Sequence, residues 1–388
     1  MKEAKDMKEG WEYKKLGEVA FYPTKRISSE MVNENNYVGV DNLIKDRGGK
    51  VVANFFPAEG NVIEYLKGDV LLGNIRPYLK KIWLSDTKGG ASGDVLIIRA
   101  NDTKHLYPNY LYWALASDQF FEYDNLHCKG AKMPRGNKID IMQYLLPIPT
   151  IEEQQQIVSE LDLLSEVIEK HKAQLEELDK LAQSIFYDMF GDPVTNEKGW
   201  EVKKIKDICK VITGNTPSRN NLEYYNEEYI EWIKTDNILR DSLYPSLAKE
   251  YLSEEGAKQG RIADVGSILI ACIAGSLESI SKCCLLNRKV SFNQQINALV
   301  PKEDMNSLFV YSLVNAIADY IRENTTNGMK HIITKSVLEE IRICVPPLSL
   351  QQEFAAKVEA IEAMKAKVRQ SLKEAETLFN ERMDYYFN

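Results

Sequence analysis

Three residues near the middle of the chain have the types and spacing that metal-dependent nucleases use. Asp192 precedes Glu201 and Lys203, and such a set could hold a divalent cation and orient a water for phosphodiester hydrolysis. The same Glu-x-Lys spacing recurs at Glu12 and Lys14, at the start of a similar segment. A repeated structural feature explains both copies better than catalysis does, because motifs this short often arise by chance. We therefore interpret both pairs as parts of strands that open two domains.

The sequence also lacks the common catalytic and cofactor-binding motifs. There is no GxGxxG, GxxxxGK[ST], HExxH or GxSxG motif, so we expect a chain that is not itself an enzyme and holds no cofactor. The six cysteines, at 128, 209, 272, 283, 284 and 344, include no CxxC pair. We expect buried, reduced thiols rather than a zinc site or a disulfide framework.

Several polar loops combine basic or amide side chains with glycine or small residues, which suits contact with DNA. Arginine and lysine neutralise phosphates or bond guanine, and asparagine reads adenine. The candidates in the first half of the chain are Thr24, Lys25, Arg26, Arg76, Tyr78, Lys80, Lys129, Lys132, Arg135, Asn137 and Lys138, and those in the second half are Asn215, Thr216, Ser218, Arg219, Asn327, Lys330, His331 and Lys335. An ordinary solvated loop is the alternative for each of them, and Arg76 and Tyr78 could equally cap and pack a strand turn.

The charge of the chain is unevenly distributed. Its net charge is −8, yet residues 1–150 carry 21 basic and 19 acidic side chains, and residues 191–346 carry 19 and 21. Residues 151–190 carry 3 basic and 10 acidic side chains, and residues 347–388 carry 6 and 7. The acidic excess therefore lies outside the two larger segments, and the composition permits DNA binding without arguing for it.

Length and hydropathy bound the class of protein. The 388 residues, 44% of them hydrophobic, suffice for two globular domains and additional elements. No stretch is apolar enough to cross a bilayer, and the charged N-terminal segment lacks the apolar core of a secretion signal. We expect a cytoplasmic protein without membrane association.

A heptad pattern follows a proline-marked segment, PIPTIEEQQQIV, that begins at Pro147. The seam positions alternate four and three residues apart, as in a coiled coil. The same design returns at a constant offset in VPPLSLQQEFAAKV, from Val345. The seam positions are Ile157, Leu161, Leu164, Ile168, His171, Leu175, Leu178, Ala182, Ile185 and Met189 in the first helix, and Phe354, Val358, Ile361, Lys365, Val368, Leu372, Ala375, Phe379, Arg382 and Tyr386 in the second. The glutamines Gln154, Gln155, Gln351 and Gln352 could cap or cross-link the helix starts, or contact a partner subunit.

The repeat divides the chain into two copies of one plan. We expect domains at 1–150 and 191–346, and long helices at 151–190 and 347–388. The first helix would carry the chain about 58 Å from one domain to the next, at about 1.5 Å per residue. A second helix that pairs with it must run back antiparallel. The predicted fold is α+β, with two similar globular α/β domains separated by two long helices that form an antiparallel coiled coil with a pseudo-twofold relation.

These features together resemble the specificity subunit of type I restriction-modification systems. The resemblance covers nearly the whole chain and rests on the duplicated target-recognition domains, the paired long helices and two helix entries. PIPTIEEQQQIV and VPPLSLQQEF are similar to the family's Pro-Pro-x-x-Glu-Gln signature, although the second has Leu350 where the first has Glu153.

The resemblance implies a non-catalytic DNA reader. Each domain would recognise one half of a bipartite, asymmetric sequence in double-stranded DNA, and the helices would fix the gap between the halves. The implied partners are two methyltransferase subunits and two restriction and translocase subunits, with S-adenosylmethionine, ATP and Mg²⁺ on those partners and no cofactor on this chain. The alternative is a coiled-coil scaffold whose globular ends bind proteins. Protection of specific DNA by a complex with the methyltransferase would separate the two.

Overall fold

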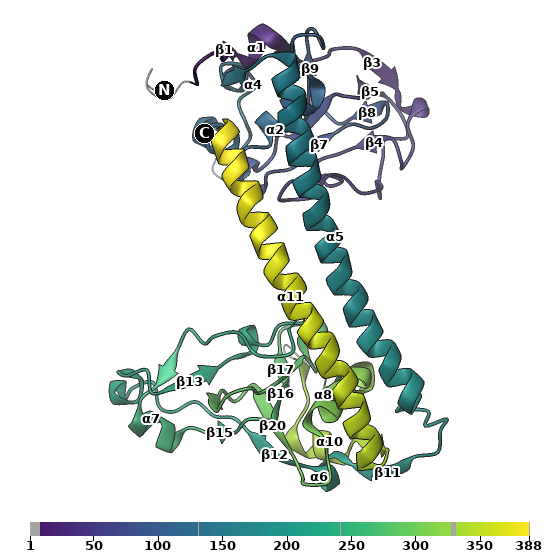
Figure 1. The fold of residues 1–388 in the computed structure, drawn as a ribbon, viewed down its shortest axis with the longest axis vertical. Helices are drawn as coiled ribbons and strands as arrows, with labels where there is room; N and C mark the ends of the chain where they lie inside the picture. The colour runs from purple at the N-terminus through teal and green to yellow at the C-terminus, as the bar shows by residue number, and fades with distance from the viewer. Residues whose placement is uncertain (1–7, 131, 241, 327–330, 388) are drawn as a thin grey trace. The chain divides into compact units, whose positions relative to one another are not determined.

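The chain forms two compact units in the computed structural model, which describes residues 8–130, 132–240, 242–326 and 331–387. The first unit contains residues through Lys172 together with those from Gln370, and the second is Ala173–Arg369. Each unit therefore combines one globular domain with the start of one long helix and the end of the other (Figure 1). None of the helices in the described residues is both long and apolar enough to span a bilayer.

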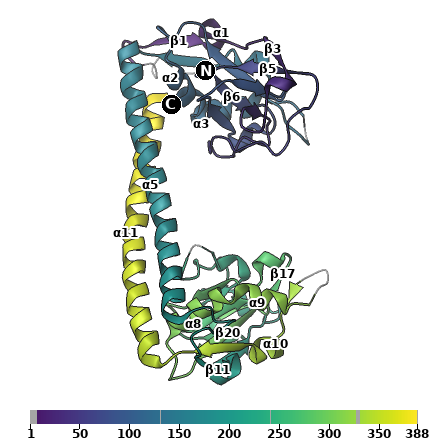
Figure 2. The same cartoon turned by 90° about the vertical axis from the view of Figure 1, so that its right-hand side faces the viewer.

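A central antiparallel sheet forms the core of the first domain. Its strands follow the order β2-β9-β6-β7, with bounds Ala20–Phe21, Val95–Ala100, Val70–Gly73 and Ile82–Leu84. Alternate residues of these strands are buried on opposite faces, so that Val70 packs with the helices and Leu71 packs with a second sheet. Helix α2 (Pro108–Leu115) lies on the first of these faces, beside β6 (Figure 2).

The second sheet of this domain has the order β3-β5-β8-β4, with bounds Arg26–Ser28, Asn61–Tyr65, Gly89–Ala91 and Tyr37–Val38. Strand β5 is antiparallel to β8, whereas β4 is parallel to β8.

The second domain repeats the plan. Its central sheet has the order β12-β20-β16-β18 (Cys209–Thr213, Ile296–Pro301, Ile268–Ala271 and Cys283–Leu285). Its second sheet has the order β14-β13-β19-β15 (Tyr251–Leu252, Ile230–Ile233, Val290–Phe292 and Ile262–Ala263). The buried strands β6 and β16 follow Gly68 and Gly266 at equivalent places in the two domains.

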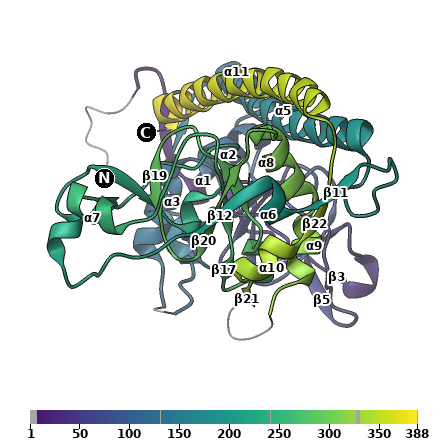
Figure 3. The ribbon, with the colours of Figure 1, turned by 90° about the horizontal axis from the view of Figure 1, so that it is seen from below.

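Short helices complete both domains. They are α1 (Leu16–Val19), α3 (Asp118–His127) and α4 (Lys138–Ile141) in the first domain, and α6 (Ile205–Ile208), α7 (Glu254–Gln259), α8 (Ser307–Ala316), α9 (Ala318–Glu323) and α10 (Lys335–Glu340) in the second. Figure 3 shows α10 beside α6 and β12 in the second unit.

The strand that opens each domain pairs with the strand that closes it. Strand β1 (Glu12–Lys15) is antiparallel to β10 (Leu145–Ile148), and β11 (Glu201–Lys204) is antiparallel to β22 (Arg342–Val345). Each closing strand runs directly into a long helix, so this pairing fixes where the helix leaves its domain. The interpretation of both Glu-x-Lys pairs as opening strands is confirmed.

The long helices are α5 (Ile151–Phe190) and α11 (Leu348–Phe387), each of 40 residues. All twenty predicted seam positions are buried or partly buried. In the first unit, Tyr386 near the end of α11 donates a hydrogen bond of 2.5 Å to Glu160 near the start of α5. In the second unit, Phe186 and Phe190 at the end of α5 pack against Phe354 at the start of α11. The pairing is antiparallel in each unit.

The predicted fold class is thus confirmed, with two similar α/β domains and two antiparallel long helices. The domain bounds, the distance over which α5 separates the domains and the twofold relation stay predictions.

One glutamine of each pair joins its helix to its domain. Gln154 accepts a hydrogen bond from the Tyr107 amide at 2.8 Å and donates to the Pro149 carbonyl at 3.0 Å. Gln351 does the same with the Asn306 amide at 2.9 Å and the Pro346 carbonyl at 2.9 Å. Both side chains are buried. Their neighbours Gln155 and Gln352 are exposed, so cross-linking explains Gln154 and Gln351 alone.

Five of the six cysteines are buried as free thiols, and burial raises the pKa of Cys272 and of Cys284 to about 12. The expectation of burial is wrong for Cys128, which is partly exposed because it follows the last turn of α3.

Candidate nucleic-acid interface

A short hairpin precedes the helix α4 in the first domain, and its counterpart precedes α10 in the second. Lys129 and Arg135 exchange two backbone hydrogen bonds of 2.9 Å. Thr326 and Ile332 form the equivalent bridge in the second domain. Within the loop predicted as CKGAKMPRGNK, Lys129 and Arg135 are thus joined by backbone hydrogen bonds.

The hairpin of the first domain is tied to the turn after β6. The Arg76 amide donates to the Pro134 carbonyl at 2.8 Å, and the Arg135 guanidinium lies 3.2 Å from an Asp94 carboxylate oxygen. Arg76 has a left-handed backbone, with φ of 55°, in the turn before the 3-10 helix Pro77–Leu79. A strained residue of this kind persists only where its surroundings hold it, and such residues cluster at binding sites. Lys132 is exposed beside the tip.

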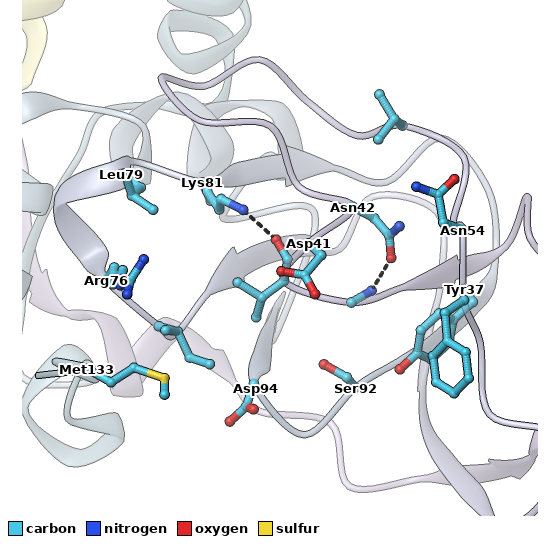
Figure 4. A pocket seen from close by; sticks show the side chains of 15 residues that line it. Tyr37, Asp41, Asn42, Asn54, Arg76, Leu79, Lys81, Ser92, Asp94 and Met133 are labelled. Atoms are coloured by element: carbon cyan, nitrogen blue, oxygen red, sulfur yellow. Dashed lines mark hydrogen bonds between the residues drawn. The ribbon is translucent and has the colours of Figure 1, made fainter. Parts of the chain in front are cut away.

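A hollow of about 620 Å³ opens beside this turn; we call it the Asp41 hollow (Figure 4). Its polar lining includes the Asp41 carboxylate, the Asn54 amide and the Arg76 guanidinium, and no described residue forms a hydrogen bond or an ion pair with these three side-chain groups. Phe55, 78% exposed, and Met133 add apolar area. The hollow thus offers an acceptor, donors and apolar faces together, the combination that can bind the edges of bases.

A second, smaller groove of about 310 Å³ contains Thr24, Arg26 and Lys138; we call it the Lys138 groove. Arg26 begins β3, and Lys138 begins α4 after the Asn137 side chain accepts a hydrogen bond from the Ile139 amide at 3.1 Å. The Tyr22 hydroxyl donates to the Lys138 carbonyl at 3.2 Å. The structure therefore brings together three predicted residues that come from opposite ends of the first domain's sequence.

The second domain carries an equivalent groove of about 750 Å³, which we call the Lys335 groove. Lys335 is the counterpart of Lys138 in the repeat and likewise begins its short helix, here after the cap Thr334. Lys210, Lys258 and Arg261 also line this groove. Sequence reasoning missed these three cations, although the segment KQGRIADVG around Arg261 has the glycines and basic residues used elsewhere as the criterion.

Some predicted contacts of the first domain have structural partners. Lys25 forms an ion pair of 2.8 Å with Glu64, and Lys80 forms one of 2.6 Å with Asp118. Arg47 pairs with the same Asp118. Tyr78 is half exposed and lies outside the residues that line the hollow and the groove. Lys80 is therefore held against α3 by its ion pair.

The first polar loop of the second domain is also held by local contacts. The Asn215 amide donates to the Gln259 carbonyl at 2.7 Å and accepts from the Arg261 amide at 2.8 Å. Thr216 donates to Gln294, whereas Ser218 is exposed. Asn215 thus positions the Arg261 backbone at the edge of the Lys335 groove.

Arg219 stacks on two aromatic rings, 4.5 Å from the centroid of Tyr225 and 4.7 Å from that of Trp232. It also pairs with Glu250 at 2.5 Å. A hydrogen bond from Lys234 is the main reason that the pKa of Glu250 lies below its ordinary value, against the opposing effect of burial, and Arg219 lowers it further. Glu250 is therefore ionised at neutral pH and holds both cations.

Three predicted residues of the second domain remain. Asn327 and Lys330 lie outside the described residues. His331 belongs to β21 (His331–Ile332), which pairs with β17 (Ile273–Ala274), and its buried Nδ1 has no hydrogen-bond partner among the described residues.

The nuclease-like set does not assemble into a cation site in the described part of the chain. Glu201 pairs with Lys203 at 3.3 Å, as Glu12 pairs with Lys14 at 2.6 Å. Asp192 instead accepts a hydrogen bond from the Val194 amide at 2.7 Å in the turn after α5. No group of three or more potential metal ligands occurs among the described residues.

A buried carboxylate lies under the first hairpin. Asp124 on α3 is 1% exposed, and neither of its carboxylate oxygens has a hydrogen-bond partner within the described structure. A Cβ atom added to Gly136 would lie 2.6 Å from Asp124 Oδ1 and 2.9 Å from Asn74 Oδ1. Burial raises the pKa of Asp124 to about 6, against an opposing effect of His127. Sequence reasoning gave no signal for this residue, because an Asp in a helix is usually solvated.

The family model described as the type I restriction modification DNA specificity domain matches residues 8–180 and 197–376. The chain is 22% identical over 307 residues to the EcoR124I/EcoR124II specificity subunit of Escherichia coli, which covers 78% of this chain and 74% of that protein. It is 25% identical over 169 residues to the HindI specificity subunit of Haemophilus influenzae, across 42% of this chain and 36% of that protein. The MjaIX specificity subunit of Methanocaldococcus jannaschii is 24% identical over 65% of this chain and 62% of its own length.

Two solved structures share the fold. One comes from work on complex assembly and conformational transition of the type I R-M system, with 22% identity, 99% of both chains covered and a TM-score of 0.61. The other is the type I restriction-modification S subunit of M. genitalium, with 13% identity, 100% of this chain and 98% of that chain covered, and a TM-score of 0.61.

Proposed function

The chain belongs to the family of type I restriction modification DNA specificity domains, and we propose that it recognises a bipartite, asymmetric sequence in double-stranded DNA. Each domain would bind one half of that sequence. One observation carries the proposal: a single chain holds the same α/β scaffold twice, with equal strand order in the central sheets and different side chains on the equivalent exposed surfaces. Two unlike readers on one scaffold suit a target with two unlike halves.

The base-reading part of each domain would be the hairpin and the surface beside β6 or β16. In the first domain Arg76, Asp41 and Asn54 supply donors and acceptors that suit the major-groove edges of bases. The backbone amides of Asn74 and Cys272 donate equivalent hydrogen bonds to the carbonyls of Asp94 and Gln295, which aligns the two strand ends. In this alignment the second domain has Ala274 in place of Arg76 and Gln295 in place of Asp94. Different side chains at equivalent places would read different bases.

The long helices would hold the two domains at the distance that sets the gap between the half-sequences. They would also receive two methyltransferase subunits, one at each end of a quasi-repeated surface, and two restriction and translocase subunits would join that complex. Leu163 is 61% exposed on α5 and suits contact with such a partner. The partners would supply S-adenosylmethionine, ATP and Mg²⁺, and this chain would supply sequence recognition alone.

The test is to produce the chain together with its methyltransferase subunits and to sequence the methylated bases in the host DNA. We expect methylation within one bipartite sequence whose two halves differ and are separated by a constant gap. A chimera that carries only the first domain of another specificity subunit should keep the second half-sequence and change the first. Methylation at one continuous sequence, or none that depends on this chain, would overturn the proposal.

A further inference from the structure

Each domain has a cationic groove at the same place in its fold. The Lys138 groove is lined by the segment that follows β2, by residues of β3, β5 and β9, and by the start of α4. The Lys335 groove is lined by β12, by the end of α7 with the segment into β15, and by the start of α10. Lys138 and Lys335 occupy equivalent positions in the repeat, each at the first residue of its short helix. Both domains keep a lysine at this position beside the groove, which indicates a task that both domains perform.

The charge of the two grooves is one-sided. The described residues that line them include no aspartate and no glutamate. In the second domain Lys258 pairs with Glu255 at 2.5 Å, and Lys335 lies 3.5 Å from Glu339.

The other cations of the grooves have no such partners. Lys210 and Arg261 in the second domain, and Arg26 and Lys138 in the first, are exposed and form no ion pair within the described structure. Each groove therefore presents at least two unneutralised positive charges.

We propose that these two grooves hold the phosphate backbone of the target DNA, and that base reading falls to the hairpins and the Asp41 hollow. The proposal rests on the function proposed above. Cations attract phosphate whatever the base sequence, and the residues that line these grooves include no carboxylate or side-chain amide that could read a base other than guanine. A contact made equally with two different half-sequences must be independent of the base sequence. The equivalent position of the grooves in the two domains is consistent with such a contact.

The predicted contacts thus separate into two kinds. Arg26, Lys138 and Lys335 would position the duplex, together with Lys210 and Arg261. Arg76 and the exposed part of the first hairpin would specify the sequence. An acidic surface of a partner subunit is the competing occupant of the grooves, and the test below distinguishes it from DNA.

The experiment uses the complex of the full chain with its methyltransferase subunits and an oligonucleotide that contains the sequence methylated by the unaltered complex. DNA binding is measured by fluorescence anisotropy between about 50 and 300 mM salt, for the double variant Lys210→Ala, Arg261→Ala and for Arg26→Ala, Lys138→Ala. Each lost phosphate contact should lower the slope of log affinity against log salt by about 0.9. We expect a decrease of about 2 for each double variant, with the methylated sequence unchanged.

The matched control exchanges the same residues for the other cation, Lys210→Arg with Arg261→Lys, and should keep the salt slope of the unaltered complex. An unchanged slope in the alanine variants would overturn the proposal, and so would a change in the methylated bases. If the alanine variants bind the methyltransferase subunits more weakly, but the complexes that still form bind DNA with unchanged affinity, the grooves contact the partner and the phosphate proposal is overturned. Failure of the unaltered complex to methylate a specific sequence would instead overturn the proposed function.

Discussion

The two domains agree in the sheet that carries the core and differ in the sheet that surrounds the surface loops. The strand order of the central sheets is the same, and β8 and β19 each pair with one antiparallel and one parallel neighbour. The fourth strand of the second sheet differs, because β3 joins β5 in the first domain and β14 joins β13 in the second. The fold therefore tolerates change on the outer edges of the second sheet, next to the surface that would read DNA.

The side chains follow the same division. The helix-joining glutamines Gln154 and Gln351 make equivalent hydrogen bonds, and both short helices begin with lysine. The positions at the end of β6 and β16 differ in charge. Where both copies keep a residue, it holds the scaffold or the grooves. Where they differ, the residues lie at the candidate reading surface.

The strongest test of the shared scaffold is the replacement of Gly89 in β8 by alanine. The equivalent residue of β19 is Val290, because both face the last residue of the antiparallel neighbour. In the first domain an added Cβ would lie 2.0 Å from the Asn36 carbonyl oxygen and 2.6 Å from the Tyr65 hydroxyl. We expect Gly89→Ala to lower the free energy of unfolding by about 4 kcal/mol or more, measured by urea denaturation.

The matched control is Gly93→Ala, because a Cβ at Gly93 meets nothing within 4 Å. Equal unfolding midpoints for the two variants would mean that β8 shifts easily to accommodate the added methyl group. Close packing would then not explain why β8 has glycine where β19 has Val290.

The buried Asp124 gives the first domain a pH dependence that the second should lack, since no aspartate or glutamate in the described part of the second domain is buried. The pKa of Asp124 is about 6 in the folded chain, against an ordinary value of 3.8. A raised carboxyl pKa means that the folded state binds the proton more tightly, so the stabilising effect is complete below pH 3.8 and is lost as the pH rises through 6. The difference corresponds to about 3 kcal/mol at pH 7.5.

Asp124→Asn should therefore stabilise the first domain by about 3 kcal/mol at pH 7.5 and have little effect at pH 3.5, as measured by urea denaturation at both values. Asp118→Asn on the same helix is the control, because Asp118 is half exposed and ion-paired. An equal effect of Asp124→Asn at the two pH values would show that its charge is compensated in the folded chain.

The reading surface is tested by Arg76→Ala in the assembled complex. Loss of the guanidinium should reduce discrimination at one base pair of one half-sequence by about 1 to 3 kcal/mol, or 5- to 150-fold, while the other half-sequence serves as the control within the same molecule. Methylation sequencing measures this directly. A uniform loss of methylation at all sites, without relaxed specificity, would assign Arg76 to phosphate binding. The hollow and the grooves would then have the same role.

Much of the fold was predictable because it depends on local patterns that repeat. The heptad spacing of α5 and α11 and the glycine-led strands β6 and β16 appear in the sequence as periodic apolar residues. The constant offset then showed that both halves share one architecture. Such patterns determine which face of an element is buried, and that alone was enough to predict two domains and antiparallel helices.

The site was less predictable because it depends on contacts between distant segments. Thr24 and Lys138 were selected in separate loops, and nothing in the sequence indicated that they share a groove. Asp41 lines the hollow, whereas the side chain of its neighbour Asn42 accepts a hydrogen bond from the Gly39 amide at 2.8 Å. Lys80, by contrast, was selected for its charge and is paired with Asp118. Composition indicates which loops are basic, but only tertiary packing decides which cations remain unpaired.

The smallest predicted effect concerns the helix pairing, at a seam position that is charged in α11 and apolar in α5. Lys365 is 4% exposed, and its ammonium lies 2.6 Å from Asp179 and 2.6 Å from Glu362. The equivalent residue of α5 is Ile168, which is buried as an apolar seam residue should be. Removing one partner of a buried ion pair destabilises a protein when the remaining charge stays buried, but the Asp179 and Glu362 side chains are 52% and 20% exposed and can be solvated by water. The desolvation cost of the buried ammonium is then removed without leaving a buried carboxylate unpaired. Lys365→Ile should therefore stabilise the second unit by about 1 kcal/mol in urea denaturation.

The same substitution should weaken the choice of partner helix. A polar residue at one seam position penalises every register that leaves it without its carboxylates, and this is the best-attested use of such groups. The Lys365→Ile chain should therefore form helix-exchanged dimers at lower concentration in sedimentation analysis than Val368→Ile, a control that adds apolar volume at the next seam position and keeps the charge. If Lys365→Ile lowers the free energy of unfolding instead, the ion pairs contribute net stability, and the lysine at this seam position is explained by stability rather than by the choice of partner helix. If it raises stability and increases exchange, the lysine distinguishes one otherwise similar helix from the other.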